Sequence, residues 1–196
     1  MRFVTGPDAD GADAAMERYS TGDDAAFTEL YDAIAPRLLS FLRKATRDGA
    51  TTEDLMQQTF LQIHRARGSF IPGAAVMPWA LAIARRLMID SARRRRLELG
   101  LFMFAPDDER MTSATTATGG AADDVFHARH LGRRVQQRLE ALPESQRTAY
   151  HLVKQEGLSL KKAAQVLGTT VTAVKLRTHR ACQALRAAVR EEGGAA

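Results

Sequence analysis

The chain has 196 residues, of which 45% are hydrophobic and 26% charged, a composition that provides for one large or two small domains with buried cores. Lys and Arg outnumber Asp and Glu by 28 to 23, and this basic balance favours polyanionic partners without requiring one. The single cysteine, Cys182, excludes an intramolecular disulfide and fits a reducing cytoplasm.

The sequence offers no constellation for catalysis or metal binding. The five histidines are scattered, and we find no CxxC pair, HExxH motif, nucleophile–base set, paired-carboxylate site or phosphate-binding loop. We therefore expect no metal, no cofactor and no enzymatic activity. The N-terminus lacks a basic start before an apolar core, and no stretch is apolar for long enough to span a membrane, so we expect neither a secretion signal nor membrane insertion.

The first part of the chain predicts a tail followed by a helical domain. Residues 1–21 are rich in Gly, Ala and Asp and show little periodicity, which predicts a flexible tail that is helical in part toward its end. From Phe27 to Leu42 apolar residues recur at spacings of three and four, and this pattern of a helix continues past Pro36. We expect a helical domain over residues 22–97.

The next predicted helix begins near Thr51 or Thr52 and ends before Gly68. At 100° per residue its core side and its opposite side separate cleanly. The core side holds Met56, Phe60 and Ile63, and the opposite side holds a set that we name the Leu61 face: Asp54, Gln57, Gln58, Leu61 and Arg65. An apolar Leu61 among hydrogen-bonding residues is either a stray surface leucine, which is common, or the anchor of a protein-docking surface. The sequence leaves both interpretations open.

A loop with a Pro72–Gly73 turn follows, and Pro78 opens another helix, which ends in a run of arginines. One side of this helix is apolar, and the other carries a set that we name the basic arc: Trp79, Arg85, Arg86, Arg93 and Arg96. Guanidinium groups bind phosphate and an indole can stack on an unpaired base, so the arc suits nucleic acid. The alternative is a core tryptophan beside solvated arginines.

The regular helical order is lost over residues 97–128. Acidic residues mix there with Ser, Thr, Gly and Ala, a composition typical of a linker and acidic where the rest of the chain is basic. Helical periodicity resumes with Val125 and continues past a break at Pro143. We expect a flexible acidic linker over 98–131 and a second helical domain over 132–192.

Residues 158–177 of that second domain predict a helix-turn-helix. Ala164 is small where two helices must cross closely, and Gly168 supplies the backbone freedom of a tight turn. Thr169 or Thr170 can cap the second helix. An ordinary helical hairpin with a solvated basic face is the alternative.

The second helix of this motif has features of a DNA-recognition helix. Val171 and Val174 are expected to be buried, which leaves short polar residues and cations for a groove. Three residues are placed to meet base edges and two to contact phosphate. These candidates are Thr170, Thr172 and Ala173 for bases, and Lys175 and Arg177 for phosphate.

Several short motifs occur in one order along both helical domains. They are Asp54–Leu61, Trp79–Arg86 followed by Asp90 and Arg93–Arg94, Leu142–Pro143, Gln146–Arg147, Glu156–Ser159, Val174–Arg177, Arg180–Ala181 and Leu185–Arg186. In this order and spacing, over roughly 130 residues, the chain resembles the small extracytoplasmic-function (ECF) group of bacterial RNA polymerase sigma factors of the sigma-70 family. Each motif is weak alone, and the set in register is specific.

The resemblance implies an all-α protein with two small domains, a sigma region 2-like helical bundle and a region 4-like helix-turn-helix, joined by a flexible acidic linker. It implies a transcription initiation factor that binds core RNA polymerase, directs it to specific promoters and helps melt the minus-ten element. The implied partners are core polymerase, through its clamp coiled coil and flap, promoter DNA, and an anti-sigma factor.

The resemblance also assigns roles to the surfaces. The Leu61 face would bind polymerase, and the base-edge and phosphate candidates of the helix-turn-helix would bind the minus-thirty-five element. The minus-ten element would meet Phe70, Trp79, Arg85, Arg86 and Arg93, with the loop from Gly68 to Met77 placed where the family captures a flipped base. The chain departs from the family pattern at Arg86, where Asn is usual, and at Lys162-Ala163-Ala164, where many members have Glu-Ile-Ala.

Two other functions remain as alternatives. A sigma-mimic interaction protein that titrates an anti-sigma factor usually carries a receiver domain, which this sequence lacks, and can lose the DNA-contacting cations, which are retained here as Lys175 and Arg177. A DNA-binding regulator that acts without polymerase would explain the helix-turn-helix, but it would give no role to the Leu61 face or to the basic arc.

Overall fold

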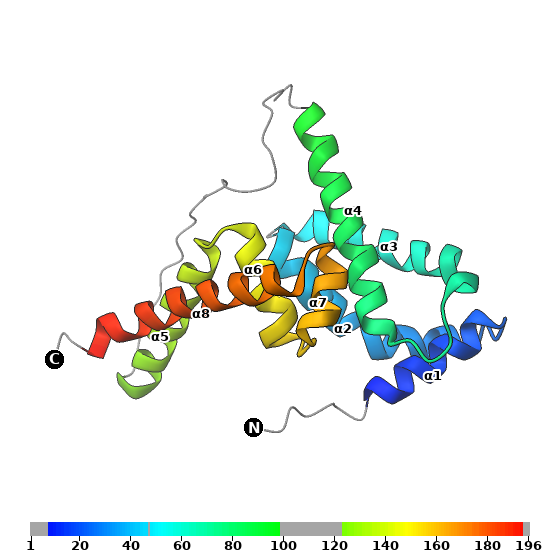
Figure 1. The fold of residues 1–196 in the computed structure, drawn as a ribbon, viewed down its shortest axis with the longest axis horizontal. Helices are drawn as coiled ribbons and strands as arrows, with labels where there is room; N and C mark the ends of the chain where they lie inside the picture. Colours follow the sequence, from blue (N-terminus) through cyan, green and yellow to red (C-terminus); the bar gives the residue numbers. More distant parts are fainter. Residues whose placement is uncertain (1–7, 47, 99–122, 194–196) are drawn as a thin grey trace.

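A computed structural model describes residues 8–46, 48–98 and 123–193, and these residues are helical apart from short turns (Figure 1). The helices are α1 Asp8–Ser20, α2 Ala26–Thr46, α3 Gly49–Ala66, α4 Val76–Glu98, α5 Asp123–Glu140, α6 Glu144–Tyr150, α7 Leu160–Leu167 and α8 Val171–Gly193. A 3-10 turn, Arg67–Ser69, follows α3, and a π-helical turn, His151–Gln155, continues α6. The predicted all-α fold is confirmed for the described residues.

Helix α1 corrects the expectation of a flexible tail up to residue 21. It packs chiefly along α2 and also touches α4, with Met16 and Tyr19 fully enclosed in the core. The buried positions 12, 15, 16 and 19 follow the spacing of an amphipathic helix. Two of these four are alanines, so the apolar pattern was hidden in an Ala-rich, acidic composition. Residues 1–7 of the predicted tail lie outside the described residues.

Helices α2, α3 and α4 form the body of the N-terminal module. Helix α2 runs unbroken past Pro36, and its buried side includes Leu38 and Phe41. Helix α3 begins at Gly49, earlier than the sequence suggested, because Asp48 caps it: the backbone N–H of Thr51 donates to Asp48 Oδ2 at 2.9 Å. Hydrogen bonds from the Thr51 side chain and then from its backbone N–H lower the pKa of the Asp48 carboxyl.

The C-terminal module is built on α8. Helices α5, α6 and α7 all pack against it. Because α5 already begins at Asp123, residues 123–131 of the predicted linker are helical, whereas residues 99–122 lie outside the described part of the chain. The linker prediction was therefore too long at its C-terminal end.

One apolar core runs through both modules, which the sequence did not indicate. Buried residues of the C-terminal module, such as Leu152 and Leu167, belong to the same cluster as Leu38 and Phe41 of α2. Helix α7, the first helix of the predicted helix-turn-helix, packs against α4. The two modules are therefore in direct contact here and are not held only by their connecting segment.

Polar contacts close the edge of this shared core. Arg37 of α2 donates from Nε to Glu156 Oε2 at 3.1 Å and from Nη2 to the Glu156 carbonyl at 2.9 Å. Lys44 Nζ donates to Gln155 Oε1 at 2.6 Å, and the same oxygen accepts from His151 Nδ1. Burial lowers the pKa of His151, and the charges of Lys44 and Arg147 act in the same direction.

We predict that Arg37→Ala destabilises the folded chain by about 1–2 kcal/mol, because the Glu156 side chain is only 7% exposed and loses its cationic partner. Urea unfolding of the full chain measures this change. A double-mutant cycle with Glu156→Ala isolates the side-chain pair. Strictly additive effects of the two substitutions would show that the ion pair does not couple the modules.

Candidate functional site

The Leu61 face is exposed on α3 as predicted. The Leu61 side chain is 48% exposed, and Asp54, Gln57 and Arg65 are exposed around it. Gln58 is half-buried, and its amide donates to Asp54 Oδ2 at 2.7 Å, which fixes two polar groups of the face relative to each other. On the opposite side, Ile63 is fully buried. The two sides of the helix are thus those that the sequence predicted.

An aromatic cluster backs this part of α3. The Phe60 ring lies 4.5 Å from the Tyr31 ring and 6.1 Å from the Phe27 ring, measured between centroids. Tyr31 is itself 42% exposed, so an aromatic side chain of α2 reaches the surface beside Phe60. Phe27 and Tyr31 are spaced as packing residues of one helix, so the sequence pattern alone does not predict this exposure.

The loop between α3 and α4 differs from the expected stacking surface. Phe70 is only 6% exposed and packs edge-on against Trp79, with 5.3 Å between ring centroids. Trp79 is half-buried against the core. The apolar side chain that the loop does expose is Ile71, at 72%, beside the turn closed by the bond from Ala74 N to the Ile71 carbonyl. Phe70 therefore supports the loop from beneath and is not presented to a ligand.

The cations of the basic arc lie along α4. Arg86 and Arg93 are exposed, and Arg85 is half-buried with polar interactions of its own; the Arg96 side chain lies outside the description. Figure 1 shows that the C-terminal half of α4 extends beyond the body of the molecule. Arg95, at this projecting end, is also exposed. Phosphate groups could approach this end without displacing a neighbouring helix.

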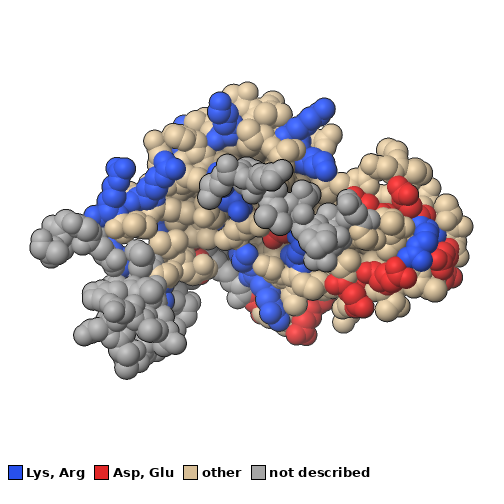
Figure 2. All heavy atoms as spheres, turned by 90° about the horizontal axis from the view of Figure 1, so that it is seen from below, with Lys and Arg blue, Asp and Glu red and all other residues tan. Residues whose placement is uncertain are grey.

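The charges are unevenly distributed over the surface. In the view of Figure 2, Asp and Glu side chains gather toward the end of the molecule where α1 lies, and most Lys and Arg side chains are spread over the remainder. Polyanion binding is therefore favoured away from the α1 end. Helix α8 lies away from the α1 end in Figure 1.

The helix-turn-helix has the capping geometry that the sequence predicted. Ser159 caps α7 by accepting from Lys162 N, and Gly168 ends it in a left-handed conformation, with φ 61°. Thr170 is the residue that caps α8, because its Oγ1 accepts from Ala173 N at 3.1 Å. Ala164 is buried at the crossing of the two helices, as expected.

The first turns of α8 expose most of the candidate DNA contacts. Thr170, Thr172 and Lys175 are exposed, while Ala173 and Arg177 are half-buried. Val174 is buried as predicted, but the prediction for Val171 was wrong, since it is 44% exposed. The buried stripe of α8 begins only at Val174, one turn into the helix, so Val171 lies ahead of it. Leu176, within the Val174–Arg177 motif, is 48% exposed.

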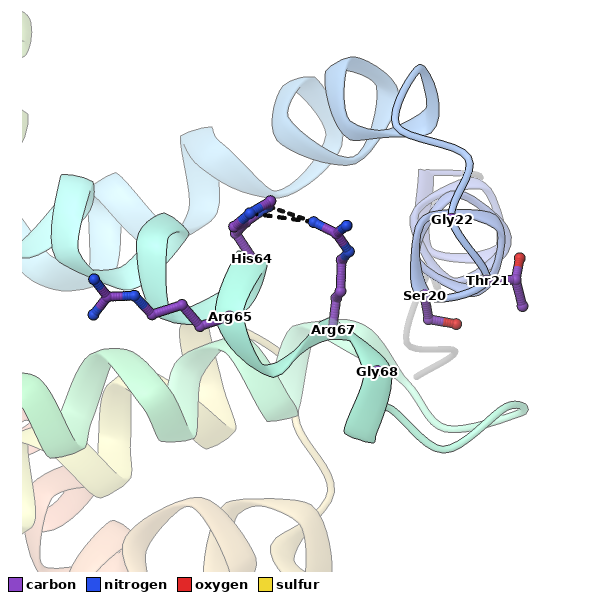
Figure 3. Close-up of a pocket in the computed structure, with 7 residues that line it drawn as sticks. All are labelled: Ser20, Thr21, Gly22, His64, Arg65, Arg67 and Gly68. Carbon is purple, nitrogen blue, oxygen red and sulfur yellow. Dashed lines mark hydrogen bonds between the residues drawn. The ribbon is translucent and has the colours of Figure 1, made fainter.

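A shallow pocket lies between the α1–α2 turn and the end of α3 (Figure 3). Arg67 extends across it, with Nη1 at 2.7 Å from His64 Nδ1 and its guanidinium over the Tyr19 ring, while Arg65 points away. These groups bind one another and join α1 to α3. Among the residues that the structure describes, no group of three or more His, Cys, Asp or Glu could hold a metal. Within the same residues, no helix is long and apolar enough to cross a membrane.

Two family models and several related sequences match this chain. The model described as Sigma-70 region 2 matches residues 30–98, and the model described as Sigma-70, region 4 matches residues 132–185. The RNA polymerase sigma factor CarQ of Myxococcus xanthus is 35% identical over 87% of this chain and 93% of its own length. The ECF RNA polymerase sigma factor SigF of Caulobacter vibrioides is 33% identical over 92% of this chain and 95% of its own length.

Solved structures show the same fold. The sigma factor RpoE in complex with the anti-sigma factor NepR from Bartonella quintana aligns with a TM-score of 0.64 at 23% identity, over 84% of this chain and 96% of that one. CnrH in complex with the cytosolic domain of CnrY aligns with a TM-score of 0.65 at 24% identity, over 93% of this chain and 99% of that one. The chain thus belongs to the ECF sigma factors of the sigma-70 family, and it is a non-enzymatic RNA polymerase sigma factor that directs promoter-specific transcription initiation.

Proposed function

We propose that the surfaces described above divide the work of initiation among themselves. The Leu61 face of α3 binds core polymerase at its clamp coiled coil. The loop after α3 and the basic arc of α4 engage the minus-ten element, and the first turns of α8 engage the minus-thirty-five element, with this module docked near the polymerase flap. The observation that carries the proposal is the exposure of Leu61 at the centre of a polar face, in which the Gln58–Asp54 hydrogen bond orders the neighbouring groups, because an apolar anchor ringed by polar groups is the usual form of a protein-binding hot spot.

The minus-ten surface combines cations with a supported aromatic pair. Arg86 and Arg93 provide phosphate contacts along the projecting helix, with Arg85 beside them. Trp79 stands at the start of α4 on the Phe70 ring. We assign Phe70 to holding Trp79 and the loop in place, and Trp79 to contact with an unpaired base.

The minus-thirty-five surface covers only the cap and the first turns of α8. Thr170 and Thr172 lie at the first turn of α8, where a recognition helix meets base edges, and Ala173 is small enough to allow close approach. Lys175 and Arg177 then serve as phosphate contacts. These five positions share the end of α8 farthest from the C-terminus.

This division of work requires the two modules to separate. The minus-ten and minus-thirty-five elements lie about 25 base pairs apart, or about 85 Å along B-DNA. Modules that share a core cannot reach both. The 24 residues between α4 and α5 span at most about 80 Å when extended, slightly less than this separation, so the extent of the modules themselves must supply the rest of the reach.

We also propose an anti-sigma factor as a partner. The structures of RpoE and CnrH are complexes of that kind, with NepR and with the cytosolic domain of CnrY. An apolar anchor in a polar face, such as Leu61, suits a partner that competes with polymerase.

Replacing Leu61 with Arg should abolish binding to core polymerase, because an unpaired arginine buried in the interface costs several kcal/mol. Binding is measured with purified core enzyme. Gln62→Arg is the matched control, since it adds the same charge at the next exposed position of α3, outside the Leu61 face. Wild-type affinity of the Leu61→Arg protein would remove this face from the interface.

Arg177→Ala should weaken holoenzyme binding to every promoter tested and flatten the dependence of log K on log salt, because one phosphate contact fewer releases fewer counterions. The measurement is a salt titration of promoter binding. Arg190→Ala, at the other end of α8, should leave the slope unchanged. An Arg177→Ala slope equal to that of wild type would contradict the assigned contact.

Trp79→Ala and Phe70→Ala should both fail on closed promoter DNA in the holoenzyme, and a premelted bubble at the minus-ten element should restore part of the loss. Melting is the step that needs a base removed from the stack, at a cost of a few kcal/mol. Transcription from the two templates is compared at equal holoenzyme concentration. Equal defects on both templates would assign the aromatic pair to folding or binding alone.

A further inference from the structure

Two carboxylates of α1 hold the loop between α3 and α4. Glu17 Oε1 accepts a hydrogen bond from the backbone N–H of Gly73 at 2.7 Å. Asp13 Oδ1 accepts from the backbone N–H of Val76, also at 2.7 Å. Both side chains are four residues apart and so project from the same side of α1. The loop is thereby fixed at its turn and at its exit into α4.

The two backbone groups that α1 binds lie at the turn of the loop and at its exit into α4. Gly73 is in a left-handed conformation, with φ 79°, at the turn beside the exposed Ile71. Val76 is the first residue of α4, where backbone N–H groups have no partner within the helix. The Asp13 carboxylate therefore caps α4 from another helix, and its charge is favourable at the positive end of the α4 dipole.

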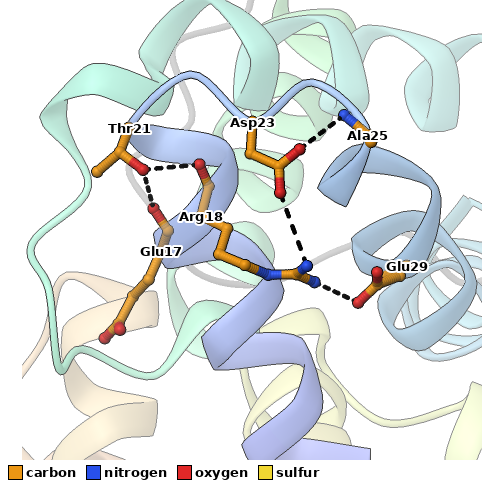
Figure 4. A network of polar contacts seen from close by, with 6 residues as sticks. All are labelled: Glu17, Arg18, Thr21, Asp23, Ala25 and Glu29. Atoms are coloured by element: carbon orange, nitrogen blue, oxygen red, sulfur yellow. Dashed lines mark hydrogen bonds and ion pairs between the residues drawn. The ribbon is translucent and has the colours of Figure 1, made fainter.

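Helix α1 is itself anchored on the other side. Arg18 forms ion pairs with Asp23 and with Glu29 of α2, and its carbonyl accepts from Thr21 Oγ1 at 2.9 Å (Figure 4). Figure 4 also shows the Glu17 side chain extending away from the α1–α2 turn. Neighbouring residues of α1 thus have separate partners: Arg18 binds α2, and Glu17 binds the loop.

We propose that Glu17 and Asp13 are positioning residues that set base discrimination at the minus-ten element. The inference rests on the proposed function of the loop and deepens it. A loop fixed before DNA arrives loses little entropy on binding, so a correctly shaped extruded base receives the full benefit of its contacts. A loop released from α1 adapts to several bases, and the discrimination between them falls. Neither carboxylate contacts DNA in this role.

A different role for the same carboxylates can be separated by experiment. Their negative charge could act only by repelling phosphate near the loop. Glu17→Gln removes the charge but keeps an oxygen that accepts from Gly73 N, whereas Glu17→Ala removes both. Asp32→Ala, which removes an exposed carboxylate of α2, controls for the loss of charge at this end of the molecule.

The test uses holoenzyme assembled from core polymerase and the full-length chain on a promoter library randomised across the minus-ten element. Wild-type holoenzyme first defines the preferred bases. Glu17→Ala should then lower the ratio of transcription from preferred to single-base-substituted promoters by about fivefold or more, and Asp13→Ala should act in the same direction. Glu17→Gln and Asp32→Ala should keep the wild-type ratio. Affinity for core polymerase and the thermal unfolding midpoint are measured for each variant, so that a general folding defect is recognised.

Hydrogen exchange of the Gly73 amide in the free chain gives a readout that does not depend on promoters. It should be faster in Glu17→Ala than in wild type or Glu17→Gln. If the library selects no minus-ten bases with wild-type holoenzyme, the proposed function of the loop fails. If wild type is selective and Glu17→Ala is equally selective, the positioning role alone is overturned. A Glu17→Gln protein that matches Glu17→Ala would assign the effect to charge and also overturn it.

Discussion

Burial of the apolar sides of the helices in one continuous core determines how the rest of this molecule is arranged. Most of a helix's stability in a protein comes from packing of its amphipathic face, so each helix places its apolar stripe against a neighbour. Once those stripes are buried, the polar and cationic sides of α3, α4 and α8 necessarily face the solvent. The Leu61 face and the first half of the basic arc are therefore consequences of packing and lie directly on the core, whereas the end of α4 that carries Arg93 extends beyond it.

The sequence predicted those parts that depend on local periodicity and on capping chemistry. The two sides of α3, the left-handed turn at Gly168 and the cap at Thr170 all follow from residues close together in the chain. Wrong or missing predictions concern contacts between distant residues. Met16 and Tyr19 are buried because α2 and α4 pack against α1. No pattern within residues 8–20 identifies those two helices as its partners.

The candidate functional surfaces were predictable from the sequence to a similar extent. Exposure of Leu61 and of the α4 arginines follows from helical angle alone, but the burial of Phe70 does not, since a loop aromatic can point either way. Its direction is decided by the Trp79 ring some nine residues later. Ile71, which the loop exposes, and Glu17, which binds the loop from 56 residues away, could be identified only once the chain was folded. The family resemblance identifies the loop between α3 and α4, but it does not identify the residues that hold this loop in place.

The core shared between the modules affects the apparent affinity for promoters as well as the arrangement of the modules. If only the separated form binds a promoter through both modules, every ligand of that form sees an affinity reduced by the fraction of molecules that are open. The Arg37–Glu156 contact then lowers the apparent affinity for all promoters by the same factor, whatever their bases. Substitutions there would rescale the whole transcriptional response without reordering it. Selection could therefore adjust how much of this protein a cell needs before its target genes respond, independently of which genes those are.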